Sequence, residues 1–266
     1  MFQPVVPFGG FAGWSFLTRT IDSQKEAYAK SPEVTRDVEY FKENISKVKT
    51  AKDLIADHTL LKVSLEAFGL GDDIDSKFFI RKVLEDGTFS DTALANKLSD
   101  KRYLEFSKAF GFGDFPVANT ALSDFGTKIT SAFKERQFEA EVGNQNEDFR
   151  LAMGIERDLS EIAEKNISPD TMWYSIMGNG PLRAVFETAF NLPSSFGSLD
   201  LETQLETFKE KAKSTFGDSG IKQFTTAEKQ EDLTKLFLLR SEMKSLGSGI
   251  GSGQIALTLL QNINTG

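Results

Sequence analysis

EVTRDVEYFKENISKV, residues 33–48, carries its apolar residues at helical spacing: Val34, Val38, Phe41, Ile45 and Val48. Intervals of four, three, four and three residues place them on one face of an amphipathic helix. Ser31 and Pro32 precede this stretch and form a favourable helix start, because Ser can cap and Pro fits the first turn. The alternating Val- and Ile-rich segments typical of strands are missing from the chain. We therefore predict an all-α protein, a multi-helix globular domain.

A short pattern recurs at three predicted helix ends. Ala-Phe-Gly or Ala-Phe-Asn, followed by an apolar residue, stands at residues 67–70, 109–112 and 189–192. Gly and Asn tolerate the left-handed conformation that ends many helices, and the apolar residue folds back onto the last turn. We predict three helices that end in this way. Two interpretations stay open: a degenerate helical repeat of about 40 residues, or independent use of a common cap.

The two ends of the chain differ from its middle. Residues 1–18 have no charged side chain and contain two prolines and three glycines, which predicts an apolar, extended arm. A helical globular region follows over residues 19–245, with a soft internal boundary near residues 143–146. Residues 246–266 begin as a Gly/Ser linker and end in a short amphipathic stub. The arm either packs on its own domain or docks to a partner.

Composition excludes whole classes of site. The 266 residues include 31 Lys plus Arg against 39 Asp plus Glu, a net charge of −8, so we expect no nucleic-acid partner. The chain has no Cys, which excludes disulfides, thiolate metal sites and cysteine nucleophiles. No run approaches the roughly 20 apolar residues of a membrane span. The 24 Phe, against 4 Tyr and 2 Trp, indicate a core packed with purely apolar rings.

Sequence motifs for catalysis are not recognisable. The chain has neither a phosphate-binding Gly-rich loop with Lys nor a nucleophile elbow. His58 is the single His, and a surface or capping position is the expected interpretation. The acidic stretch at residues 72–75 lacks the Gly and Glu of an EF-hand loop. We predict no catalytic, cofactor-binding or metal-binding residue, no cofactor, and no enzyme activity.

Apolar residues at both termini are the candidates for contact with a protein partner. A linker followed by an amphipathic stub is typical of a tethered docking segment, although a helix that returns to its own domain has the same pattern. The sequence leaves the oligomeric state open. The predicted partner-docking residues are Phe2, Val5, Val6, Phe8, Phe11, Trp14, Ile255, Leu259 and Ile263.

Five stretches resemble a known family. They are PFGGFAGWSFLTRT at 7–20, DHTLLKVSLEAFGL at 57–70, FIRKVLEDGT at 79–88, LANKLSDKRY at 94–103 and WYSIMGNGPLRAVFETAFNLPSSFGSLDLETQLETF at 173–208. The chain resembles a family of uncharacterised alphaproteobacterial proteins, a domain of unknown function, whose genes often lie among flagellar genes. The resemblance implies a role connected with the flagellum or motility. It carries over no catalytic or ligand-binding residue.

Two functional hypotheses follow. The first is a non-enzymatic interaction or assembly protein connected with the flagellum, whose protein partner is a flagellar component. The alternative is a small-ligand binder or an enzyme whose site is made of carboxylates and Lys. We expect a cytoplasmic location, with export as part of a flagellar assembly as the alternative.

Overall fold

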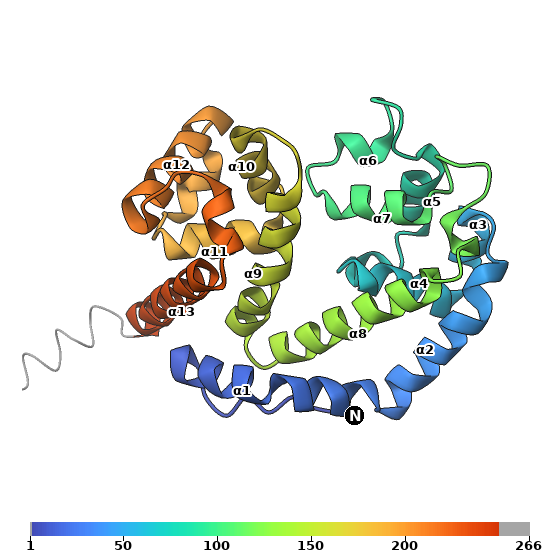
Figure 1. The fold of residues 1–266 in the computed structure, drawn as a ribbon, viewed down its shortest axis with the longest axis horizontal. Coiled ribbons are helices and arrows are strands. Elements are labelled where there is room, and N and C mark those ends of the chain that lie inside the picture. The colour runs from blue at the N-terminus through green and yellow to red at the C-terminus, as the bar shows by residue number, and fades with distance from the viewer. Residues whose placement is uncertain (1, 250–266) are drawn as a thin grey trace, which may run out of the picture. The chain divides into compact units, whose positions relative to one another are not determined.

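The structure is a computed structural model that describes residues 2–249 (Figure 1). These residues form helices and loops and include no strand, which confirms the all-α class. The chain divides into two compact units. Unit 1 contains the residues up to Val6, Leu17–Arg150 and Ser175–Gly180, and unit 2 contains Pro7–Phe16, Leu151–Tyr174 and the chain from Pro181 onward. The region 19–245, expected as one globular region, therefore holds parts of two units.

Four helices contain residues of both units: α1 (Gly10–Ala29), α9 (Glu147–Glu164), α10 (Pro169–Met177) and α11 (Gly180–Ala189), of which only the first residue, Gly180, belongs to unit 1. Helix α8 ends at Gly143 and α9 begins at Glu147, so a helix break lies where the sequence indicated a soft boundary. Within residues 2–249, no helix has the length and apolar character needed to cross a membrane.

Unit 1 is built around a buried helix. Helix α4 packs along α8, and α2 contacts both of them (Figure 1). Leu61, Val63 and Leu65 on α4 are fully buried, so this helix is apolar on most of its circumference. The helices of this unit are α2 (Pro32–Asn44), α3 (Ala51–Ala56), α4 (His58–Ala67), α5 (Lys77–Asp86), α6 (Leu94–Lys97), α7 (Arg102–Phe110) and α8 (Phe125–Gly143).

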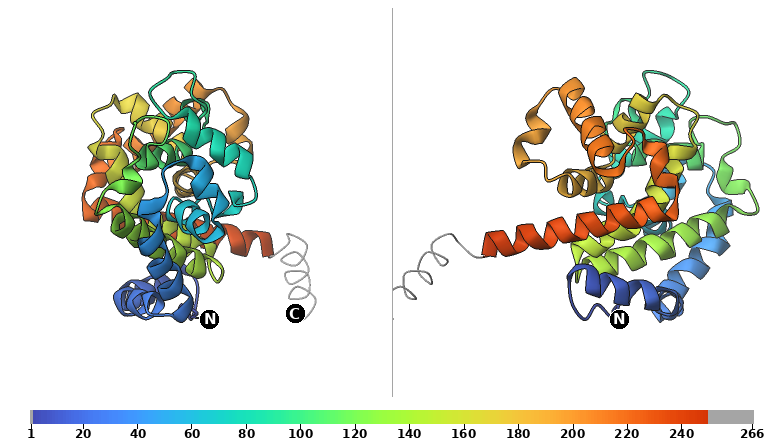
Figure 2. Two further views of the ribbon diagram at one scale, coloured as in Figure 1. Left: turned by 90° about the vertical axis from the view of Figure 1, so that its right-hand side faces the viewer. Right: turned by 60° about the vertical axis from the view of Figure 1, so that its left-hand side comes forward.

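Unit 2 has an aromatic core. The Trp173 ring stacks on Phe208 at 5.5 Å and meets Phe186 edge-to-face at 5.3 Å. The indole N–H of Trp173 donates to the Ser219 carbonyl at 2.8 Å, which satisfies its polar group inside the core. The remaining helices of this unit are α11 (Gly180–Ala189), α12 (Leu201–Phe216) and α13 (Ala227–Gly249), and Figure 2 shows α13 as one continuous helix.

The three predicted helix caps are confirmed. Gly69, Gly111 and Asn191 have φ of +69°, +66° and +53°. After Gly69 and Asn191, the next amide bonds back five residues, Leu70 to Leu65 and Leu192 to Glu187, as in a Schellman motif. At Gly111 a single bond from its own amide to the Ser107 carbonyl ends α7. Both interpretations of the recurrence, a degenerate repeat and independent use of a common cap, stay predictions.

Two segment boundaries are corrected. Residues 1–18 were expected to be extended throughout, but α1 begins at Gly10. Gly13 is buried, so close packing outweighs its poor helix propensity. At the other end, α13 continues to Gly249, four residues into the segment 246–249 expected to start the linker. The rest of the linker and the stub lie outside the described residues.

Candidate functional site

The start of the chain packs on a surface of unit 1. We call residues 2–6 the arm, and the surface formed by Gln24, Tyr28 and Gln145 the arm-binding surface. The Val5 N–H donates to Gln24 Oε1 at 2.6 Å, and Gln24 Nε2 donates back to the Val5 carbonyl at 3.3 Å. Gln145 Nε2 donates to the Pro4 carbonyl at 2.6 Å. The side-chain amides of Gln24 and Gln145 thus form hydrogen bonds with the backbone of the arm, as the backbone of a neighbouring strand would.

The ring of Phe2 anchors the arm. It meets the buried Tyr28 edge-to-face at 5.6 Å, and Tyr28 in turn packs on Phe138 at 5.8 Å. This ring contact and the three hydrogen bonds to Gln24 and Gln145 hold the arm on unit 1.

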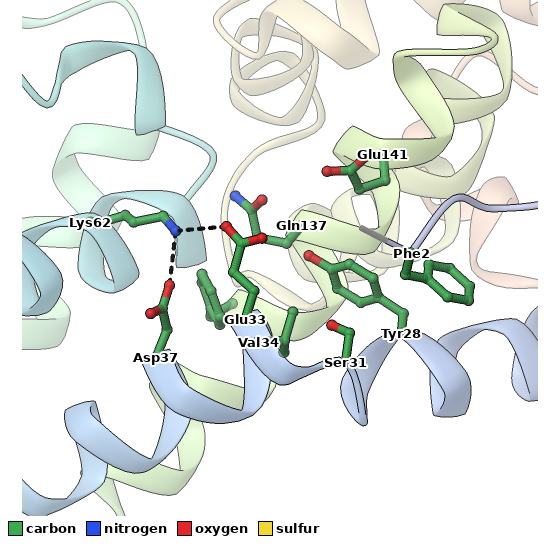
Figure 3. Close-up of a pocket in the computed structure, with 10 residues that line it drawn as sticks. Phe2, Tyr28, Ser31, Glu33, Val34, Asp37, Lys62, Gln137 and Glu141 are labelled. Atoms are coloured by element: carbon green, nitrogen blue, oxygen red, sulfur yellow. Dashed lines mark hydrogen bonds and ion pairs between the residues drawn. The ribbon is translucent and has the colours of Figure 1, made fainter.

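A small cavity lies beside Phe2 and Tyr28 (Figure 3). Its volume is about 60 Å³, enough for a few water molecules or a very small ligand. Carboxylates and aromatic rings form most of its wall, and Lys62 is its single cationic group. The lining residues are Phe2, Tyr28, Ser31, Glu33, Val34, Asp37, Lys62, Phe133, Gln137 and Glu141.

Lys62 joins α4 to two carboxylates of α2. Its Nζ lies 2.8 Å from Asp37 Oδ2, which is buried, and 4.0 Å from Glu33 Oε1 (Figure 3). Burial alone would lower the pKa of Lys62. The hydrogen bond to Asp37 and the negative charges of the surrounding carboxylates outweigh burial, so the pKa of Lys62 is raised overall. Burial, with the negative charges of Glu141 and Glu66, raises the pKa of the Tyr28 phenol well above its usual range. Lys62 and Tyr28 therefore both stay protonated at neutral pH.

Glu66 lies one turn after Lys62 on α4. Burial raises the pKa of Glu66 to about 7, opposed by the charge of Lys62 and reinforced by Asp37 and Glu33. Its Oε2 atom is buried and has no hydrogen-bond partner within residues 2–249, which disfavours the charged form. A carboxyl with a pKa of about 7 is partly protonated at neutral pH. In the described part of the chain, no group of three or more His, Asp or Glu could hold a metal ion.

The structure separates the predicted docking residues. Phe2 and Val5 belong to the arm on unit 1, and Val6 is half-buried there. The other three lie in unit 2: Phe8 is exposed and packs on Phe16 at 6.4 Å, Phe11 lies 5.2 Å from Lys235 Nζ, and Trp14 is half-buried. Ile255, Leu259 and Ile263 lie outside the described residues. His58, as expected, is exposed, at the first position of α4.

Unit 1 also carries an exposed apolar surface that sequence reasoning missed. Phe89 and Phe115 meet edge-to-face at 5.5 Å, yet they are 73% and 46% exposed. Val117, two residues further, is 70% exposed. We call these three residues the aromatic surface. Isolated exposed apolar residues are normal on proteins, but two exposed rings in contact mark a candidate interaction site.

Two interlocked loops hold the aromatic surface in place. A Cβ on Gly113 would lie 2.4 Å from the Gly87 nitrogen and 2.5 Å from the Glu85 carbonyl oxygen, so only Gly allows this backbone approach. The Asp114 carboxylate then accepts bonds from the Thr88 N–H at 2.6 Å, the Thr88 hydroxyl at 2.9 Å and the Phe89 N–H at 3.3 Å. These contacts fix the two loops that carry Phe89 and Phe115. We call the loops around Gly87 and Gly113 the braced loops.

A sequence signal for this surface exists. Gly87-Thr88-Phe89 and Gly113-Asp114-Phe115 both have the form Gly, hydrogen-bonding residue, Phe. The two stretches lie 26 residues apart in the sequence, and the hydrogen bond between Thr88 and Asp114 joins them in the fold. The pattern indicates two loops, but not that they meet.

Comparison with known proteins gives the family. Residues 67–230 match a family model described as "Protein of unknown function (DUF1217)". The fold is similar to the X-ray crystal structure of a protein from Agrobacterium tumefaciens, a structural genomics target, with a TM-score of 0.73 and 28% sequence identity. That similarity covers 91% of this chain and 99% of the other. No curated protein matches the chain. Because the family model spans more than half of its length, the chain belongs to the DUF1217 family.

Proposed function

We propose that this protein is a non-enzymatic interaction or assembly protein, and that the aromatic surface is its docking site. The observation that carries the proposal is the contact between Phe89 and Phe115, which is kept in solvent by the braced loops around Gly87 and Gly113. Exposed apolar area contributes nothing to folding stability, whereas burying it against a partner yields about 25 cal/mol per Å². A rigid aromatic pair also loses little conformational entropy on binding, which is typical of interaction hot spots.

The partner we propose is a flagellar component with a complementary apolar surface. This part of the proposal rests on the family resemblance seen in the sequence and on the location of that family's genes. We propose a cytoplasmic location, and export as part of a flagellar assembly is the alternative.

A pull-down from motile cells tests the docking site. C-terminally tagged protein is compared with the double variant Phe89→Ser/Phe115→Ser and with Phe78→Ser, and partners are identified by mass spectrometry. Phe78 is the matched control, because it is 81% exposed on α5 and has no ring contact within the described residues. We expect flagellar components with the wild type and Phe78→Ser, and at least a tenfold loss with the double variant. Equal recovery with all three proteins would contradict the proposal.

The chain termini are a second docking element that we propose. Two further variants, lacking residues 2–9 or 250–266, belong in the same pull-down. A loss of partner with either truncation, while circular dichroism shows an unchanged helix content, supports docking through that terminus. Full recovery with both truncations restricts docking to the aromatic surface.

One observation favours the alternative function, a small-ligand site. The cavity is lined by Lys62 together with the carboxylates of Glu33, Asp37 and Glu141. Its volume of about 60 Å³ limits the ligand to a few heavy atoms. Native mass spectrometry of gently purified protein tests it. A retained small mass that disappears in Lys62→Met favours the ligand site, and an unliganded spectrum with an intact protein–protein complex favours docking.

A further inference from the structure

Helix α13 of unit 2 exposes an apolar stripe. Leu239 and Met243 are 52% and 56% exposed. Residues four apart in a helix lie about 40° apart around its axis, so these two side chains follow one line along α13. Leu233 and Phe237, on another face of the same helix, are buried in the core of unit 2. We call Leu239 and Met243 the α13 stripe.

The start of α1 covers the side of α13 next to the stripe. Lys235 Nζ lies 5.2 Å from the centre of the Phe11 ring, and a Cβ on Gly10 would lie 2.6 Å from Glu242 Oε2. Lys235 and Glu242 are about 20° apart around α13, so both contacts place the first turn of α1 along one side of it. The exposure of the α13 stripe shows that this contact stops short of it.

The chain that follows α13 has the composition and the spacing to cover the stripe. Residues 246–266 contain no charged side chain. Ile255, Leu259 and Ile263 recur every four residues, which is also the spacing within the α13 stripe. Five residues, 250–254, connect the end of α13 at Gly249 to Ile255. A connection of about two to five residues is usual between two antiparallel helices that form a hairpin.

The positions along the two segments also match. At about 1.5 Å per residue, Met243 and Leu239 lie about 9 and 15 Å before the end of α13. In a helix that starts at Ile255 and runs back along α13, Leu259 and Ile263 would lie about 6 and 12 Å from its start. Each pair is thus separated by about 6 Å, so Leu259 can meet Met243 while Ile263 meets Leu239.

We propose that residues 255–263 pack on the α13 stripe of their own chain, as the second helix of a helical hairpin. The occupant follows from its absence of charge, its matching apolar spacing and the short connection to α13. The inference depends neither on the aromatic surface nor on a flagellar partner. One consequence is that a partner that binds residues 250–266 has to displace them from the stripe.

Disulfide cross-linking tests the pairing, because the chain has no Cys of its own. Full-length Met243→Cys/Leu259→Cys is compared with Ser245→Cys/Leu259→Cys under the same mild oxidant. Ser245 is the matched control, since it is exposed and lies two residues from Met243 on the opposite side of α13. Non-reducing gel electrophoresis at low protein concentration measures the rates. We expect a cross-link within one chain to form at least tenfold faster in the first variant.

Two outcomes of this experiment would overturn the proposal. Equal rates in the two variants would show that residue 259 has no preferred place on α13. A Met243→Cys/Leu259→Cys cross-link that joins two chains would place residues 255–263 on a second copy instead.

Protection from proteolysis keeps the native segment and gives a second measurement. Chymotrypsin cleavage within residues 255–263 is followed by mass spectrometry in the wild type, in Leu239→Ser/Met243→Ser and in Leu201→Ser, a control at a 59% exposed position of α12. We expect cleavage to be at least threefold faster in the double variant and unchanged in the control. A threefold change corresponds to about 0.7 kcal/mol, so the contact is weak and α13 folds without it. Equal cleavage in all three proteins would contradict the hairpin. Phe89→Ser/Phe115→Ser should leave cleavage unchanged, so the hairpin and docking at the aromatic surface fail separately.

Discussion

Phe residues form two contrasting clusters in this protein, one buried in unit 2 and one exposed on unit 1. In unit 2, Phe208 is fully buried and contacts Trp173, Phe190 and Phe196. In unit 1, Phe89 and Phe115 contact each other and stay in solvent. The first group stabilises the fold, while the second adds little to stability and is kept in place by glycines and one carboxylate. This contrast implies that substitutions in the two groups separate stability from binding.

The largest effect is expected in the buried group. Phe208→Ala removes a ring that packs against three aromatic neighbours and should lower the free energy of unfolding of unit 2 by about 3–5 kcal/mol. Chemical denaturation followed by Trp fluorescence measures this, because Trp14 and Trp173 both belong to unit 2. Leu239→Ala, at an exposed position of α13, is the control and should change stability by less than about 0.5 kcal/mol. Similar losses in both variants would contradict the assignment of Phe208 to the core.

A smaller effect is expected where the exposed group is braced. In Gly113→Ala the new Cβ meets backbone atoms of Glu85 and Gly87, which cannot move as a flexible side chain can. We expect a cost of about 1–3 kcal/mol and a displacement of the loop that carries Phe115. Hydrogen exchange at the Thr88 and Phe89 amides reports this directly, since both donate to Asp114. Unchanged protection of these amides would show that the loops are not interlocked.

The raised pKa of Glu66 predicts that the stability of unit 1 depends on pH. We expect this effect to be similar to or smaller than that of Gly113→Ala. The pKa of Glu66 is about 7 in the folded protein and about 4.3 in an unfolded chain, so the folded state binds the proton more tightly. The contribution of Glu66 to the free energy of unfolding is therefore fully present below about pH 4.3 and is lost as the pH rises toward 7. One pKa unit corresponds to about 1.4 kcal/mol, and partial solvent screening leaves a loss on the order of 1–3 kcal/mol.

Glu66→Gln should remove this pH dependence, because the amide does not ionise while Lys62, Asp37 and Glu33 around it are kept. Unfolding free energies between pH 5 and pH 8 measure the difference. Glu39→Gln, an exposed carboxylate on α2, is the matched control and should keep the wild-type slope. A Glu66→Gln protein with the wild-type slope would show that another group causes the pH dependence.

Local chemistry was readable from the sequence, and long-range contact was not. The caps at Gly69, Gly111 and Asn191 follow from residues within one helical turn, so the sequence predicted them. The start of α1 depends on the burial of Gly13, which no local pattern reveals. The aromatic surface likewise depends on a backbone approach between Gly87 and Gly113. The arm residues were recognised as apolar, but the two glutamines that bind the arm are polar and drew no notice.

The smallest effect on stability is expected for the exposed rings themselves. Phe89→Ser leaves most neighbours untouched, since the ring is largely in solvent and contacts mainly Phe115. The free energy of unfolding should fall by less than about 1 kcal/mol, the value of one aromatic pair. The same denaturation series measures it, with Phe78→Ser as the control for loss of an exposed ring without a ring contact. A loss of unfolding free energy comparable to that of Phe208→Ala would contradict the claim that the Phe89 ring adds little to stability. A near-neutral Phe89→Ser that also loses the partner would instead show that the braced loops serve binding, because the fold does not require the ring.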